Sequence, residues 1–363
     1  MTLIHHAAGP NPLVGFRVEL AKISRVGHDL ERPECILAER DGTLWAADAR
    51  GGVMRIAPDG SQELIVQMAD PRFNLGGGAA AERLLTGTLP NGLAFTANGD
   101  ILIANFGTDR LERMTRAGDT CVLLDRIDGN PLGKVNFVLR DRRDRIWITV
   151  STLVNPWSDA VSASLADGYI VLIDDKGPRV VADSLFFANE IRLDAEEEWL
   201  YVAETTAKRV SRLRVQSDGS LTGREIYGPP NLGTGLIDGI AFDVYGNLWA
   251  TMIFADRLVA ITPKGDLLEL MEDGDRASTQ RFEAAFATGK PVPFDVMLAC
   301  GGPTCNWLAS VTFGGPDLST VYLGGLRSTS IPVFQSPVAG LPMSHWGIVR
   351  PKWHGGPRAA SGW

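Results

Sequence analysis

The sequence predicts an all-β protein, a six-bladed β-propeller with four-stranded antiparallel blades around a central channel, as one domain over residues 1–363. The first observation is a phrase that recurs six times, made of a short apolar run, a polar turn and a second run rich in Trp, Ile, Val and Tyr. That pattern is typical of a β-hairpin. The second is the spacing of about 55 residues per copy, close to the repeat length of a propeller blade. The third is that two more apolar runs follow the hairpin, as at residues 53–67 and 258–271.

The six copies give the innermost hairpin of each blade in turn. They begin at Glu34 (ECILAERDGTLWAAD), Asn91 (NGLAFTANGDILIAN), Asn136 (NFVLRDRRDRIWITV), Asn189 (NEIRLDAEEEWLYVAE), Asp238 (DGIAFDVYGNLWATM) and Ala309 (ASVTFGGPDLSTVYLG). Interior aromatic side chains of β architectures belong mostly to the core, so we expect those of the second strands to fill the wedges between blades. They are Trp45, Trp147, Tyr201, Trp249 and Tyr322. The N-terminal run at residues 16–23, FRVELAKI, is expected to complete the last blade and remove an exposed sheet edge.

Three insertions interrupt the repeat, at residues 69–88, 151–168 and 276–289. Loops on one face of a rigid scaffold commonly build its binding site. The first two insertions adjoin hairpins of the repeat, so we expect them to cover the mouth of the channel. Trp157 in the second insertion is the candidate apolar contact for a substrate.

The charge balance limits the partners of this protein. The chain has a formal net charge of -8 and a pI near 5.3, whereas nucleic acids and anionic membranes bind positive surfaces. We therefore expect a small-molecule substrate, no nucleic-acid or membrane partner, and a monomer or small homo-oligomer. No apolar run has the length of a membrane helix and no secretory signal pattern opens the chain, which predicts a cytoplasmic location. The four cysteines form no CxxC pair and are expected to be reduced.

Five of the six copies begin with an acidic or amide residue. Taken singly, Asn91-Gly92 and Asp238-Gly239 are typical turn dipeptides, and Glu34 is an ordinary surface acid. Their recurrence at one position of the repeat instead indicates that these side chains point into the same end of the channel. Two carboxylates and up to three amide oxygens suit one hard divalent cation, calcium above all, with zinc, manganese and magnesium as alternatives. No His or Cys stands at these positions, which argues against a zinc or copper centre.

The chain also resembles a known family. The segments ECILAERDGTLWAADARGGVMRI, PNGLAFTANGDILIANFG, ANEIRLDAEEEWLYVAET, IDGIAFDVYGNLWAT and FGGPDLSTVYLGGL are similar to the senescence marker protein, gluconolactonase and luciferin-regenerating enzyme family. The similarity runs from about Pro33 to about Gly325. It implies a six-bladed propeller with one catalytic divalent metal in the channel, and most characterised members of the family open lactones.

The resemblance also implies roles for single residues. Carried over by motif, the metal ligands fall on Glu34, Asn189 and Asp238, and Asn136 either ligates the metal or contacts the substrate. Lys134 lies near a position where some relatives carry a substrate-binding Arg.

Two further residues are candidates for contact with the substrate, Asn91 in the second copy and Asn105 after its hairpin. Many gluconolactonase-like members read Glu-His-Gly where this chain reads Asn105-Phe106-Gly107. The replacement of an acid and an imidazole by an amide and a phenyl ring makes that wall less suited to a polyhydroxylated sugar.

Together these inferences predict a divalent-metal-dependent hydrolase. It would be a lactonase in which the cation polarises the carbonyl of a cyclic ester and Asp238 acts as the base. Two alternatives use the same ion. One is a phosphotriesterase-like or non-hydrolytic activity, such as that of an isomerase or dehydratase, and the other is a non-catalytic binding propeller whose ion only plugs the channel.

Overall fold

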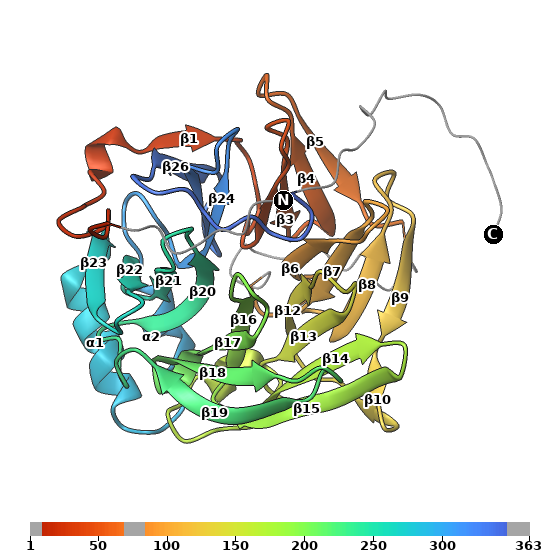
Figure 1. Ribbon diagram of the computed structural model, residues 1–363. Helices are drawn as coiled ribbons and strands as arrows, with labels where there is room; N and C mark the ends of the chain where they lie inside the picture. Colours follow the sequence, from red (N-terminus) through yellow and green to blue (C-terminus); the bar gives the residue numbers. More distant parts are fainter. Residues whose placement is uncertain (1–8, 69–83, 347–363) are drawn as a thin grey trace.

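The computed structural model describes residues 9–68 and 84–346. Within them, six four-stranded antiparallel sheets are arranged as a ring around a central channel (Figure 1). The prediction of a six-bladed propeller is confirmed. The first strands of neighbouring blades contact one another around the channel, so the residues that open these strands can meet in one place.

The strands of each blade follow one another from the channel outward. Blades one to three are β2 (Ile36–Ala38), β3 (Leu44–Asp48), β4 (Gly52–Ile56) and β5 (Gln62–Val66); β6 (Pro90–Phe95), β7 (Ile101–Asn105), β8 (Arg110–Met114) and β9 (Thr120–Leu124); β12 (Val135–Arg140), β13 (Ile146–Val150), β14 (Gly168–Asp174) and β15 (Gly177–Leu185). Blades four and five are β16 (Ala188–Leu193), β17 (Trp199–Glu204), β18 (Arg209–Val215) and β19 (Leu221–Tyr227); β20 (Leu236–Phe242), β21 (Leu248–Ile253), β22 (Arg257–Ile261) and β23 (Leu267–Glu272). A small hairpin, β10 (Arg126–Ile127) and β11 (Asn130–Pro131), precedes the third blade.

The sixth blade joins the two ends of the described chain. It consists of β24 (Leu308–Gly314), β25 (Thr320–Gly325), β26 (Ile331–Gln335) and the N-terminal strand β1 (Ser24–Val26), which pairs antiparallel with β26. An N-terminal strand therefore closes the ring, but it lies just after the expected run at residues 16–23. That run contains a short 3-10 helix, η1 (Leu20–Lys22), and its apolar side chains pack on the core of the last two blades. The outer edge strand of the sixth blade is instead the more polar segment Ser24–Val26.

The large aromatic residues of the second strands are core residues, as predicted. Three indoles are fully buried, and each Nε1 donates a hydrogen bond to an acid six residues earlier in the turn of the same hairpin. The pairs are Trp45 with Glu39 (2.7 Å), Trp147 with Asp141 (2.9 Å) and Trp249 with Asp243 (2.9 Å). Trp249 also contacts Phe313 of the next blade edge to face, with 5.2 Å between ring centroids. The indoles thus fill the wedges between blades.

We expect Trp249→Ala to lower the free energy of unfolding by about 3–5 kcal/mol, because it leaves a cavity between the fifth and sixth blades. Trp249→Phe should cost less, since a ring still fills the space and Asn247 still donates to Asp243. Denaturant unfolding measures both. Trp199→Ala is the control, because that indole, at the first position of β17 in the fourth blade, is only partly buried. Equal losses for Trp249→Ala and Trp199→Ala would contradict the assignment.

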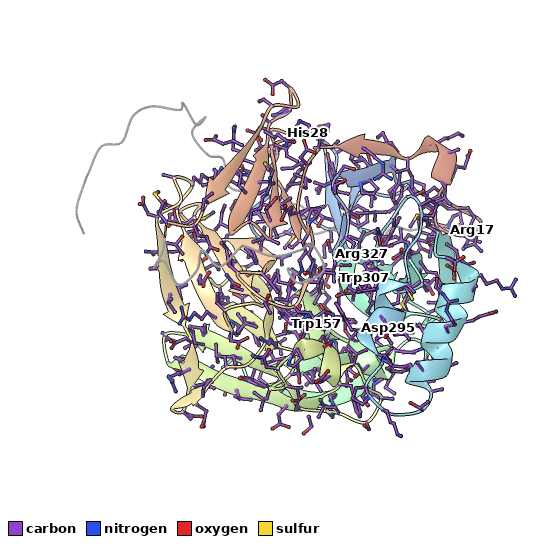
Figure 2. The ribbon with its side chains drawn as sticks, turned by 180° about the vertical axis from the view of Figure 1, so that it is seen from behind. Arg17, His28, Trp157, Asp295, Trp307 and Arg327 are labelled. Carbon is purple, nitrogen blue, oxygen red and sulfur yellow. The ribbon has the colours of Figure 1, made fainter. Side chains whose placement is uncertain are left out.

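One mouth of the channel is covered by two of the predicted insertions. The second contains the short 3-10 helix η4 (Trp157–Ala160), and the third contains α1 (Arg276–Phe286), which is followed by α2 (Phe294–Leu298). Their apolar side chains form one cluster. Figure 2 presents this face, with Trp157 and Trp307 near its middle. Of the first insertion, residues 69–83 lie outside the described residues, and Leu84 accepts a hydrogen bond from the Trp157 indole (2.9 Å).

The opposite mouth is crossed by the segment at residues 340–346. Its hydrogen bonds reach three different blades. Leu341 N donates to Phe242 O (2.8 Å), Ser344 Oγ donates to Arg140 O (2.8 Å), and His345 Nε2 lies 2.9 Å from Ala38 O. This segment, which we call the C-terminal strap, links the first, third and fifth blades at that end of the channel.

Two further sequence expectations can be compared with the structure. None of the four cysteines is in a disulfide, as predicted. Among residues 9–68 and 84–346, no helix combines the length and the apolar character that crossing a membrane requires.

Candidate metal centre

The innermost strands are irregular at the residues that open the repeat. In five blades the pairing of the first strand with the second skips one or two residues at this point. The skips lie between Pro90 and Leu93, Val135 and Phe137, Ala188 and Ile191, Ile237 and Ile240, and Leu308 and Ser310. An extra residue in one strand bends it locally and re-aims side chains, a device found often beside binding sites. The polar side chains can therefore turn toward the channel.

The five polar residues that open the repeat line one cavity, of about 430 Å³ including open solvent, at the covered mouth. Its polar lining is Arg32, Glu34, Asn91, Asn136, Asn189, Thr205 and Asp238. Its apolar lining is Phe106, Trp157, Val161, Phe187, Leu236, Ile253, Phe254 and Leu326. The structure thus brings together side chains from the first five blades that are up to 204 residues apart in the sequence, Glu34 and Asp238. Ala309, which opens the sixth copy, is not part of the lining.

Several buried oxygen atoms in this cavity have no hydrogen-bond partner among the described residues. They are Oδ1 of Asn91, Asn136, Asn189 and Asp238. The amide nitrogens are used elsewhere: Asn91 Nδ2 donates to Asn136 O (3.0 Å) and Asn189 Nδ2 donates to Thr205 Oγ1 (3.2 Å). These bonds orient the amides, and buried polar atoms without partners are rare in folded proteins. Unpaired carboxylate and amide oxygens are the ligands that calcium prefers, so the residues present fit such an ion.

The two carboxylates of the cavity are buried, which disfavours their charged forms. Burial is the main cause that raises the pKa of Asp238 well above its ordinary value, and the nearby Glu34 adds to the rise. Burial also raises the pKa of Glu34, while the adjacent guanidinium of Arg32 works in the opposite direction. Arg32 Nη1 lies 2.9 Å from Glu34 Oε2. A divalent cation between the carboxylates would favour their charged forms and remove their repulsion.

The donor set argues for calcium rather than zinc. In the described part of the chain, no group of three or more His, Cys, Asp and Glu side chains is close enough to hold a metal ion. The cavity offers two carboxylates, three amides and one hydroxyl. Zinc prefers nitrogen and sulfur ligands, whereas calcium takes six to eight oxygens, water included.

Two residues expected to contact substrate do not line the cavity. Asn105 is fully buried; its Oδ1 accepts from three backbone N–H groups and its Nδ2 donates to Thr88 Oγ1 (2.9 Å) and Glu112 Oε2 (3.0 Å). The ammonium of Lys134 is also buried, and it pairs with Asp109 Oδ1 at 2.9 Å. Both side chains stabilise loops instead.

Among the lining residues that were not candidates in the sequence, three bear on the chemistry of the cavity: Phe106, Thr205 and Arg32. Phe106 follows Asn105 directly, and Thr205 opens the 3-10 helix η5 (Thr205–Ala207). Arg32 stands two residues before Glu34, and both side chains line the cavity although the backbone at Arg32 is left-handed, with φ of 56°. The short spacing between Arg32 and the candidate ligand Glu34 was the one feature of the sequence that could have identified Arg32 as a lining residue.

A second cavity, of about 800 Å³ including open solvent, lies beneath the C-terminal strap. Arg140, Arg142 and Arg192 line it, together with Asp194 and Glu197 and many apolar residues. None of its described carboxyl or amide oxygens is buried without a partner. Among the described residues of the two cavities, the unpaired buried oxygens that could bind a cation therefore lie in the first cavity, at the other end of the channel.

Comparisons with known proteins agree with this geometry. The family profile described as SMP-30/gluconolactonase/LRE-like region matches residues 34–282. A curated protein named 6-deoxy-6-sulfogluconolactonase, from Pseudomonas putida, is 23% identical over 211 residues, which cover 56% of this chain and 59% of the relative. The match thus spans less than two thirds of that relative.

Solved structures share the fold. A gluconolactonase from Xanthomonas campestris is similar with a TM-score of 0.58 at 18% identity, covering 86% of this chain and 91% of that one. A calcium-binding protein, regucalcin, from Agrobacterium tumefaciens gives a TM-score of 0.61 at 14% identity, covering 89% and 97%. At these identities the likeness concerns the propeller architecture.

Proposed function

Because the chain belongs to the SMP-30/gluconolactonase/LRE-like family, we propose that it is a calcium-dependent lactonase that opens cyclic esters in this cavity. The single observation that carries the proposal is the set of unpaired buried oxygens, contributed by four separate blades to one cavity. Such an arrangement costs stability unless a ligand compensates it. Polar groups kept at that cost commonly mark functional sites.

In this proposal Glu34, Asn189 and Asp238 hold the cation, with Asn136 and Asn91 completing the oxygen set. A bound calcium ion supplies positive charge that polarises the ester carbonyl and makes water easier to deprotonate. Thr205 fixes the amide of Asn189, and Asn189 in turn contacts the carboxylate of Asp238. The ligands are thereby oriented before the substrate arrives.

Asp238 is the proposed base. Its carboxylate takes a proton from water as the water oxygen bonds to the lactone carbonyl carbon. The ring C–O bond then breaks, and the leaving alkoxide takes that proton back from Asp238 to give the hydroxy acid. A cation lowers the basicity of a neighbouring carboxylate, but burial of Asp238 acts in the opposite direction.

The walls of the cavity favour a lactone with an apolar body. Phe106 and Trp157 contact one another edge to face, with 6.1 Å between ring centroids, and both line the cavity. Asn105 and Lys134 are engaged elsewhere, so we assign substrate contact to these two aromatic residues instead. They offer no hydrogen-bond partners for ring hydroxyls, since the Trp157 indole N–H is already bound to Leu84 O. The Pseudomonas putida relative is named for a gluconolactone that carries a sulfo group, which supports testing substituted lactones as substrates.

A substrate screen tests the proposal. With calcium present, we expect γ- and δ-lactones bearing an alkyl or aryl substituent to be hydrolysed faster than glucono-δ-lactone, as followed by proton release. A phosphotriester such as paraoxon serves as the comparison. Faster hydrolysis of the phosphotriester would favour the phosphotriesterase-like alternative. Absence of hydrolysis with calcium, manganese, zinc and magnesium alike would favour a binding propeller.

A further inference from the structure

The cavity contains one guanidinium that the proposed cation site does not require. Arg32 is 7% exposed and lines the cavity beside Glu34. Its Nη1 lies 2.9 Å from Glu34 Oε2 and donates to Pro90 O at 3.3 Å. Its Nε is buried and has no hydrogen-bond partner among the described residues. A guanidinium has five N–H donors in a planar fork, so this one retains capacity for a further acceptor.

Arg32 changes the charge of the cavity. The lining holds two carboxylates, Glu34 and Asp238, and one guanidinium, so its ionised side chains carry a single net negative charge. A divalent cation would turn this into a single net positive charge. The nearby acid Glu190 does not alter the count, because it lies outside the lining and pairs with Arg192 at 2.7 Å. An ion-loaded cavity with a surplus positive charge favours an anionic ligand.

We propose that Arg32 binds an anionic substituent of the substrate, such as a sulfonate or carboxylate, so that the preferred lactones are anionic. This inference rests on the proposed lactonase function and names its substrate class. A planar guanidinium binds two oxygens of such a group through parallel hydrogen bonds, which are stronger than bonds between neutral partners. The anionic group would lie next to Glu34, while the apolar body of the lactone contacts Phe106 and Trp157.

A counterion role for Arg32 alone explains less of the geometry. Neutralising Glu34 needs one nitrogen, yet Nε is also buried and left without a partner. The backbone of Arg32 is left-handed, with φ of 56°, a conformation that costs an L-residue stability. The bond from Glu34 N to Arg32 O, at 2.7 Å, accompanies this turn. The cost is expected where the position of the side chain matters.

Kinetics on matched lactones test the proposal. Two six-membered lactones would be compared, one carrying a sulfonate and the other the uncharged sulfonamide at the same ring position. We expect the unmodified protein to prefer the sulfonate. Arg32→Gln should raise the ratio of KM for the sulfonate to KM for the sulfonamide on the order of 10- to 100-fold. Arg32→Lys should lie between, since it keeps the charge but not the fork.

A binding measurement separates this inference from the proposed activity. Calorimetry of the calcium-loaded protein with cyclohexanesulfonate, and with cyclohexanesulfonamide as the neutral probe, requires no turnover. If the unmodified protein hydrolyses no lactone but binds the sulfonate through Arg32, the lactonase proposal fails and the anion site stands. Equal binding of the sulfonate by the unmodified protein and Arg32→Gln would overturn the anion site.

Arg50→Gln is the matched control. Arg50 pairs with the buried Asp48 of the same blade at 2.7 Å and does not line the cavity. Its removal reports the general effect of losing an Arg–carboxylate pair in this blade. It should leave the preference for the sulfonate unchanged. If Arg50→Gln reduced that preference as much as Arg32→Gln, the effect would be structural and the proposal would be wrong.

Discussion

Asp238→Asn is expected to lower kcat for lactone hydrolysis by about 10²–10⁴-fold with calcium at saturation, the range that a positioned general base typically contributes. The amide keeps an oxygen ligand but cannot accept the proton of water. The same change should leave the metal-free protein at least as stable as before, because it removes a carboxylate whose burial and proximity to Glu34 oppose its ionisation. Loss of activity without loss of stability is typical of a functional residue. Near-normal turnover would reject the role assigned to Asp238.

The matched control lies at the other end of the same strand. Asp243 directly follows β20, is buried, and accepts hydrogen bonds from the Trp249 indole and from Asn247 Nδ2 (2.8 Å). Asp243→Asn should therefore lower the unfolding free energy, since an amide cannot accept from all of these donors. Its activity per folded molecule should be retained. The two variants would thus give opposite patterns in chemical denaturation and in assays of initial rate.

Removal of divalent cations with EDTA is expected to abolish hydrolysis while the propeller stays folded, and added calcium should restore the rate. The ring is held closed without an ion, because β1 pairs with β26 and side chains at the second strand of one blade bond to the innermost strand of the next. Ser151 Oγ donates to Ala188 O (2.7 Å), and Thr251 Oγ1 donates to Ala309 O (2.8 Å). Circular dichroism and initial rates at one temperature, with and without chelator, measure the two properties together.

Calcium should also raise the unfolding temperature, since binding to the native state adds about 3 kcal/mol when free calcium is 100 times its Kd. That effect alone would be expected of an ion that only plugs the channel. Hydrolysis that persists in EDTA, with only the melting temperature reduced, would support the plug and contradict a catalytic ion. Asp238→Asn in the same titration reports how much of the calcium affinity depends on its charge.

The sequence was informative about the fold and about the convergence of polar residues because both follow from repetition. A hairpin that recurs six times defines the blades, and the residue that opens each copy must face the same axis as its counterparts. Glu34 and Asp238, more than 200 residues apart, could be placed in one cavity on this basis alone.

Residues outside the repeat were harder to place, because the direction of a side chain depends on local irregularities. In a regular strand the side chains of Lys134 and Asn136 would point to the same face. The pairing of the first two strands skips a residue between Val135 and Phe137, so these two side chains point to different places. Likewise Asn105 and its neighbour Phe106 face different surroundings, so the phenyl ring reaches the cavity and the amide does not. No composition or spacing in the sequence reveals a bulge of this kind.

The C-terminal strap makes the two ends of the channel unlike. The oxygen-rich cavity lies at the mouth under the second and third insertions, whereas residues 340–346 bond to three blades at the other mouth. If the proposed reaction takes place in this cavity and the strap keeps the far mouth shut, substrate and product would share one aperture. Release of the newly charged acid would then decide how soon the next lactone could enter.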